Sequence, residues 1–128
     1  MILRSFEDLE VWKIGHHLRK DLSILVKSFP NEEKYRSVDQ IIRASRSVTN
    51  NIAEGYGRFH YQEIIQFCRQ SRGSLTELVD HLIVAFDEGY IDEIQLNKLK
   101  NDCLECVKVL NGYISYLKKA KNEELTSN

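Results

Sequence analysis

The sequence predicts an all-α protein: an antiparallel, up-down-up-down, left-handed four-helix bundle formed by a single domain over residues 1–121. The 128 residues match the length of one domain, and one proline and six glycines leave few helix breakers. Apolar residues recur at steps of three and four along four segments, which is the period of a helix that buries one face. Loops of roughly two to five residues between these segments require antiparallel neighbours.

The first helix is expected over about residues 6–29. Ser5 can serve as its N-cap, and the acidic residues that follow favour the positive end of the helix dipole. Pro30 ends the helix because the residue before a proline is pushed out of the helical conformation. The buried stripe consists of Leu9, Trp12, Leu18, Leu22, Leu25, Val26 and Phe29.

The second helix is expected over about residues 32–56, with Asn31 as its N-cap. Gly55 and Gly57 are expected to end it, because glycine accepts the left-handed conformation that a helix C-cap uses. Small and polar residues are frequent in this helix, more than a helix with only a core-facing stripe needs. The stripe consists of Val38, Ile41, Ile42, Ser45, Val48, Ile52 and Tyr56.

The third and fourth helices are expected over about residues 61–88 and 93–119. Gly89 follows the third helix as its C′ residue, and Asp92 begins the fourth in a capping-box arrangement. The fourth helix has the most regular pattern, because leucines and cysteines alternate at steps of three and four, as at the a and d positions of a left-handed bundle. The polar residues 122–128 are expected to form a disordered tail.

Charge is unevenly distributed although the whole chain has a net charge of only −1. Residues 40–73 contain five arginines and two glutamates, whereas residues 74–97 contain six acidic residues and no Lys or Arg. These segments are either solvated helix faces or two complementary patches that meet between helices or between subunits. Head-to-tail contacts of such patches would close a ring.

The arginines are the main candidates for a binding surface. They form two pairs at i, i+3 spacing at similar distances from the predicted turn, so both pairs could line one surface. The first interpretation is pairing with Glu54, Glu63, Glu77 or Asp39, within one subunit or across an interface. The second is contact with phosphate groups of RNA or DNA, for which arginine is well suited. The candidate nucleic-acid-binding residues are Arg43, Arg46, Arg58, Arg69 and Arg72.

Small and polar residues on the same two helices predict close packing, on the bundle itself or on a neighbouring subunit. Gly73 lies in mid-helix, where glycine costs about 1 kcal/mol relative to alanine, so a packing reason is expected. Asparagines are poor interior helix residues and need hydrogen-bond partners where they are buried. The candidate packing or oligomer residues are Asn50, Asn51, Glu54, Gly55, Gly73 and Glu77.

No residue pattern matches a catalytic, metal or cofactor site. Cys103 and Cys106 form a CxxC spacing, but no second pair of ligands accompanies them and both fall on the apolar seam of the fourth helix. We therefore expect no enzyme, no catalytic residue, no metal, no cofactor and no small-molecule substrate. Three cysteines, the lack of a signal peptide and the lack of a membrane span predict a cytoplasmic protein.

Several blocks of the sequence carry a family resemblance. They are Asp8-Leu-Glu-Val-Trp12, Phe29-Pro30 followed by Glu33-Lys-Tyr35, Gln40-Ile-Ile-Arg43-Ala44, Ser47-x-x-Asn50-Asn51-Ile-Ala-Glu-Gly55 with Arg58, and Arg72-Gly-Ser-Leu-Thr-Glu-Leu78. By these blocks the chain resembles the 23S ribosomal RNA intervening-sequence protein family, also called the four-helix bundle protein family, over roughly residues 5–118.

The resemblance implies an antiparallel four-helix bundle that has no catalytic activity and assembles as a closed ring, with pentamers among similar proteins. Some relatives are encoded inside insertions in 23S ribosomal RNA genes. A similar protein, the accessory variability determinant of diversity-generating retroelements, is strongly basic and binds nucleic acid and its reverse transcriptase.

The chain departs from the family pattern at Thr49, where proline is frequent, at His60, where a serine or threonine cap is usual, and in its slightly acidic charge. The low charge argues against nucleic-acid binding, because such binding depends on neutralising phosphates. We expect a homo-oligomeric binding or scaffolding module; the alternative is an RNA- or DNA-binding accessory protein.

Overall fold

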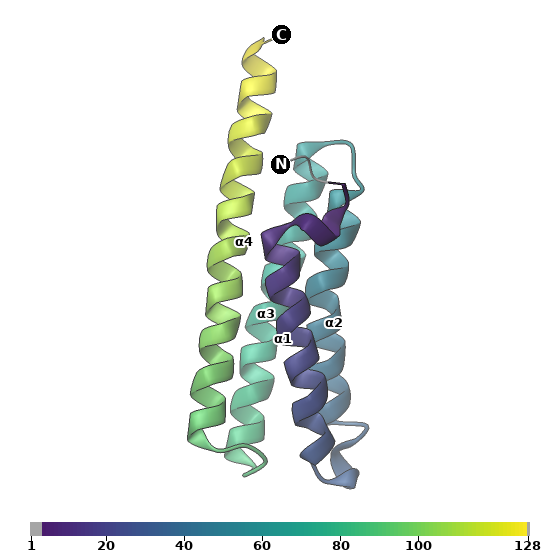
Figure 1. The fold of residues 1–128 in the computed structure, drawn as a ribbon, viewed down its shortest axis with the longest axis vertical. Helices are drawn as coiled ribbons and strands as arrows, with labels where there is room; N and C mark the ends of the chain where they lie inside the picture. Colours follow the sequence, from purple (N-terminus) through teal and green to yellow (C-terminus); the bar gives the residue numbers. More distant parts are fainter. Residues whose placement is uncertain (1–3, 128) are drawn as a thin grey trace.

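The computed structural model describes residues 4–127, which contain four long helices and no strand. α1 spans Glu10–Leu25, α2 Ser37–Tyr56, α3 Tyr61–Asp87 and α4 Glu93–Ser127. Successive helices run in opposite directions and lie along one another (Figure 1). The predicted all-α bundle is therefore confirmed, and the left-handed twist stays a prediction.

The first predicted helix, residues 6–29, is interrupted. Ser5 caps only a short 3-10 helix, Phe6–Asp8, and Leu9 is extended, so α1 begins at Glu10. The interruption brings the Phe6 ring edge-on to Trp12 at 5.3 Å between centroids. Residues six positions apart point in different directions on a continuous helix, so this contact requires the bend.

The second predicted helix also begins later than expected. Asn31–Glu33 forms a separate 3-10 helix, Arg36 is not helical, and α2 starts at Ser37. The Glu33 carboxylate accepts hydrogen bonds from the Ser37 N–H at 3.3 Å and from the Tyr90 hydroxyl at 2.8 Å. Glu33 thus connects the start of α2 to the loop between α3 and α4, and it does not lie in the first turn of a long helix.

The helix ends follow two different mechanisms. Gly55 lies inside α2 and Gly57 has φ −78°, so the prediction that these glycines end α2 in a left-handed conformation was wrong. Among the described residues, Gly89 is the one with positive φ, at 81°, and it follows α3 as predicted. Asp92 and Gln95 exchange the expected capping-box hydrogen bonds at 2.9 and 2.7 Å.

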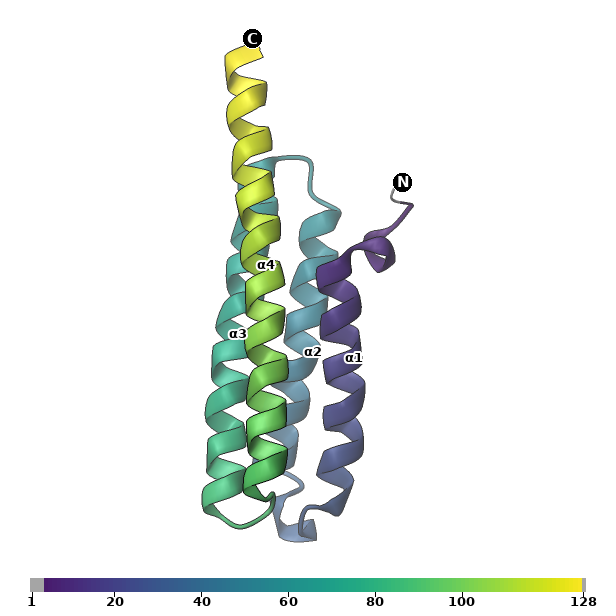
Figure 2. The ribbon, with the colours of Figure 1, turned by 60° about the vertical axis from the view of Figure 1, so that its left-hand side comes forward.

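α4 is longer than predicted and extends past the other helices (Figure 2). Residues 122–127, expected to be disordered, continue the helix to Ser127, and residue 128 lies outside the described residues. Glu123, Glu124 and Leu125 in this stretch have good helix propensity, and no glycine or proline interrupts it. Lys121 Nζ also donates to Gln62 Oε1 on α3 at 2.8 Å, which connects the extension to the bundle.

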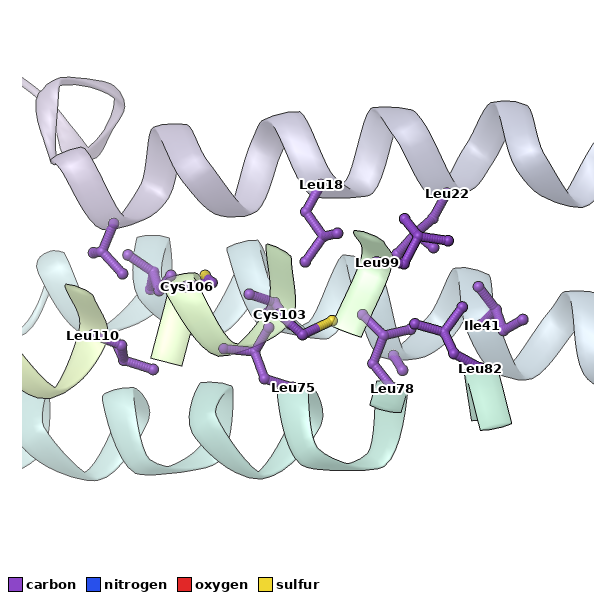
Figure 3. Packing of buried hydrophobic residues seen from close by; sticks show 14 of the residues in the cluster. Leu18, Leu22, Ile41, Leu75, Leu78, Leu82, Leu99, Cys103, Cys106 and Leu110 are labelled. Carbon is purple, nitrogen blue, oxygen red and sulfur yellow. The ribbon is translucent and has the colours of Figure 1, made fainter. Parts of the chain in front are cut away.

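The core contains side chains from all four helices (Figure 3). Each fully buried leucine or isoleucine stabilises the fold by roughly 1.5–3 kcal/mol, so these residues determine how the helices pack. Cys103 and Cys106 occupy core positions, as predicted. The members without exposed surface are Leu22, Ile41, Leu75, Leu78, Leu82, Ala85, Cys103, Cys106 and Leu110.

The four helices are not packed equally. α2 contacts α3 most extensively, whereas α1 has the least contact with α4 among neighbouring pairs. Of the helices in residues 4–127, none combines the length and apolar character that crossing a bilayer requires.

Candidate functional site

Small residues bring α2 and α3 close together. A Cβ atom at Gly55 would lie 2.9 Å from the Cβ of Phe67, a distance that side chains essentially never adopt. The buried Ser71 hydroxyl donates to the Val48 carbonyl oxygen at 2.8 Å across the same interface. Gly55 therefore contributes to packing within the chain.

The two asparagines of α2 have different surroundings. Asn51 is half-buried, and its Nδ2 donates to the carbonyl and hydroxyl oxygens of Ser47 at 2.9 and 3.0 Å. Ser47 in turn shares a 2.8 Å hydrogen bond with the Ser74 hydroxyl on α3. Asn50 is exposed, and its side chain has no hydrogen-bond partner among residues 4–127. Asn51 thus supports the α2–α3 contact, whereas Asn50 is available to a ligand.

Gly73 is exposed in the middle of α3, and a Cβ there would meet no atom within 4 Å. The expected packing reason is therefore not found within the described part of the chain. Gly112 on α4 has the same open surroundings. The two glycines lie level with each other, because their neighbours Arg72 and Asn111 form a 2.8 Å hydrogen bond.

Arg58 lies at the corner between α2 and α3. Its guanidinium is 2.7 Å from Glu54 Oε1 and 3.9 Å from Glu63 Oε2, and it lies over the Phe67 ring at 4.9 Å. The carboxylate partners are two of those that the sequence suggested. Arg58 is therefore engaged in holding the corner together.

Arg69 and Arg72 are directed away from the arginines of α2. Arg72 Nη1 donates to Asn111 on α4, and Arg69 Nη1 reaches Gln66 Oε1 on its own helix at 3.4 Å. Glu77 pairs with His81 Nε2 at 3.1 Å and with none of the five candidate arginines. The structure thus brings Arg43 and Arg46 together and leaves the other three arginines elsewhere.

Arg43 and Arg46 line an open cavity of about 570 Å³ between α1 and α2, here called the α1–α2 hollow. Arg19 of α1 lines it as well, and its Nη1 donates to the buried Thr49 hydroxyl at 2.9 Å. Arg43 is 3.7 Å from Asp39 Oδ2, whereas the Arg46 guanidinium has no ionic or hydrogen-bond partner among residues 4–127. The lining consists of Phe6, Trp12, Arg19, Arg43, Arg46, Ser47, Thr49, Asn50 and Ala53.

Sequence reasoning placed Trp12 in the core and did not consider Arg19. Trp12 is half-buried, stacks on His16 at 4.7 Å with 19° between the rings, and lines the hollow. The i, i+7 spacing of Trp12 and Arg19 on one helix side was the available signal. Gly112 was missed too, although it is a mid-helix glycine like Gly73.

The buried thiols are poor nucleophiles. Burial raises the pKa of Cys68 to about 11 and the pKa values of Cys103 and Cys106 to about 12. All three are therefore protonated near neutral pH, whereas the reactive form of cysteine is the thiolate. Within residues 4–127, no three His, Cys, Asp or Glu side chains gather closely enough to hold a metal ion.

Comparison with known protein families identifies the family of this chain. The model of the family described as 23S rRNA-intervening sequence protein matches residues 7–112. The chain belongs to this family. No curated protein matches the chain.

A solved structure supports the fold of this 23S rRNA-intervening sequence family member. It is a crystal structure of a protein with unknown function from the S23 ribosomal protein family of Bacteroides thetaiotaomicron. The two chains share 24% sequence identity with a TM-score of 0.75, and the match covers 81% of this chain and 97% of the other. The likeness concerns the fold, and the family resemblance predicted from the sequence blocks is confirmed.

Proposed function

We propose that this family member is a cytosolic, non-catalytic four-helix bundle that self-associates into a closed ring and acts as a binding or scaffolding module. The observation that carries the proposal is the α3–α4 face, defined by Gly73, Gly112, Ile83 and Leu104. Each glycine costs the isolated helix about 1 kcal/mol relative to alanine, and no contact in the described chain requires it. A helix of a second subunit that approaches closely would require both.

Exposed apolar side chains on the same pair of helices support this proposal. Ile83 is 37% exposed and Leu104 57% exposed. Each lies on the same helix as its glycine, closer to the loop that joins α3 and α4. Burying such side chains against another subunit would stabilise the oligomer by the area removed from water. Large exposed apolar side chains near small residues are typical of surfaces that pack against a partner helix.

Enlarging the glycines tests the proposal. Gly73→Gln and Gly112→Gln each favour the helix, so the monomer should fold at least as well, while the bulk blocks close approach. At micromolar concentration, multi-angle light scattering should report an oligomer for the wild type and a monomer for the double variant. Ser23→Gln, a similar enlargement at an exposed position of α1, is the matched control and should leave the oligomer intact. A wild-type monomer, or an unchanged oligomer in the double variant, would refute the proposed face.

Salt dependence distinguishes an apolar from an ionic interface. If the arginine-rich and acidic segments also meet between subunits, raising salt from about 50 mM to about 1 M should weaken the oligomer, because exposed charge pairs are screened. An oligomer that does not respond to salt would place the stabilisation in apolar contacts of the α3–α4 face.

RNA or DNA binding is a second candidate function. The α1–α2 hollow favours it, because three arginines line this hollow and none of its described lining residues is acidic. Binding would use fewer arginines than the five that the sequence suggested, since Arg58 and Arg72 are engaged within the chain. Filter binding to structured RNA at about 150 mM salt tests this function, and no binding at micromolar concentration would exclude it.

A further inference from the structure

The α1–α2 hollow has two chemically different ends. Gly15 fixes the register of the antiparallel helices, because a Cβ there would lie 3.2–3.3 Å from the side chains of Val48 and Thr49. Trp12 and Ala53 therefore line one end of the hollow, Arg43 and Arg46 line the other, and the Arg19 guanidinium reaches Thr49 between them. One end is aromatic and the other is cationic.

The cationic end has more positive than negative charge, because Arg19 and Arg46 have no carboxylate partner among residues 4–127. Arg19, Arg43 and Arg46 line the hollow and no described acidic residue does; the carboxylates near Arg43 lie outside it, Asp39 at 3.7 Å and Glu77 across a second cavity. Like charges around one hollow repel one another, and a bound anion would offset this repulsion. Arg19 is held by Thr49, so its remaining N–H groups keep a fixed direction. Oriented guanidinium groups suit the oxygens of a phosphate, which they can bind in bidentate geometry.

The aromatic end presents a ring that is fixed in position. Trp12 stacks on His16 and meets Phe6 edge-on, and both contacts restrict the indole. Aromatic side chains bind nucleobases by stacking, which contributes about 1–3 kcal/mol per base. Asn50 lies on α2 between Arg46 and Ala53, and its unpartnered amide can donate to and accept from a base or a ribose.

We propose that the α1–α2 hollow binds a nucleoside phosphate, with the phosphate at Arg19, Arg43 and Arg46 and the base against Trp12. The volume of about 570 Å³ is sufficient for such a ligand. The backbone positions of Trp12 and Arg19 are about 10 Å apart along α1, and the Arg19 guanidinium reaches back to Thr49, so a phosphate contact and a base contact lie next to each other in the hollow. The nucleoside phosphate is a free nucleotide or one unit of a single-stranded RNA. The proposal is independent of self-association and rests on the second candidate function only in the RNA case.

Trp12 provides the measurement, because it is the only tryptophan in the sequence. Its fluorescence, excited at the red edge to avoid nucleotide absorption, is titrated with ATP, with UMP, with inorganic pyrophosphate and with a short oligouridylate. Saturable quenching by a mononucleotide indicates a free nucleotide as ligand, and quenching by the oligouridylate alone indicates an RNA strand. Pyrophosphate has no base to quench Trp12, so its binding is measured by displacement of ATP, and it should bind more weakly than ATP.

The variant Arg46→Gln should weaken the saturable binding about tenfold, the loss of roughly one charge-assisted contact. Arg43→Gln serves as a second variant, and circular dichroism should show both folded, because both side chains are exposed. Arg69→Gln removes the same charge from an exposed position on α3 and should leave the affinity within a factor of about two.

Three results would overturn the proposal. The first is no saturable quenching with any nucleotide or with the oligouridylate. The second is pyrophosphate binding as tightly as ATP, which would show that the base does not contribute to the affinity. The third is equal weakening by Arg46→Gln and Arg69→Gln, which would indicate diffuse electrostatic attraction. In that third case, oligouridylate binding that persists would leave RNA binding as a function while excluding the hollow as its site.

Discussion

Gly55 and Gly73 are both helical glycines, yet alanine should stabilise the protein at Gly73 and leave its stability unchanged or lowered at Gly55. Gly73→Ala adds a methyl group in open space on α3, where nothing lies within 4 Å. Gly55→Ala places the same group 2.9 Å from the Cβ of Phe67 and 3.4 Å from the Ile64 carbonyl oxygen. Neither neighbouring atom is the end of a flexible side chain, so the helices themselves must move apart.

The magnitudes follow from two opposing effects. Alanine stabilises a helix interior by about 1 kcal/mol relative to glycine, so Gly73→Ala should raise the free energy of unfolding by about that amount. Gly55→Ala gains at most the same amount and loses about 1–3 kcal/mol to overpacking. Because the helix contribution largely cancels, the two variants should differ by about 1–3 kcal/mol.

Urea unfolding followed by circular dichroism measures both variants. The protein concentration is kept where light scattering reports a monomer, so that self-association does not contribute to stability. Thermal unfolding should agree, with a shift of about 4 °C for each kcal/mol in a chain of this size. If Gly55→Ala were as stabilising as Gly73→Ala, close approach of α2 and α3 at Gly55 would not be limiting, and the packing interpretation would fail.

Three further predictions concern titration and buried hydrogen bonds. Burial raises the pKa values of the three core thiols, so the stability that depends on them should be lost as pH rises above about 8.5; urea titrations that stay flat up to pH 11 would contradict this. Tyr90→Phe should raise the pKa of Glu33, measured by NMR, because the Tyr90 hydrogen bond chiefly lowers it; acid destabilisation through this carboxyl should then weaken. Ser71→Ala should cost about 1 kcal/mol in urea unfolding, because the Val48 carbonyl oxygen loses a buried hydrogen bond.

The existence of the helices and most of the core could be predicted because apolar periodicity records which side of each helix is buried. The helix starts could not, because they depend on contacts between distant residues. Phe6 lies outside α1, where it contacts Trp12. Glu33 lies outside α2, where it accepts a hydrogen bond from Tyr90, which is distant in the sequence. Local capping rules rank the available starts, and tertiary contacts then select among them.

The arginines show the same limit at the level of the site. Spacing at i, i+3 establishes that Arg43 and Arg46 share a side of α2, and that Arg69 and Arg72 share a side of α3. It does not establish how the two helices are rotated relative to each other. That rotation follows from the buried core residues of both helices; in the resulting arrangement Ser47 faces Ser74, and Arg72 is directed toward Asn111 on α4.

A mid-helix glycine has no sequence signal that separates packing within a chain from packing between chains. Gly55 and Gly73 lie among similar small residues, and both carry the same loss of helix propensity. Only the position of the neighbouring helix distinguishes them, because Gly55 has Phe67 against it and Gly73 has open space. If a second subunit fills that space, bulk at Gly73 should dissociate the oligomer while stabilising the monomer, a pair of opposite effects that intrachain packing could not produce.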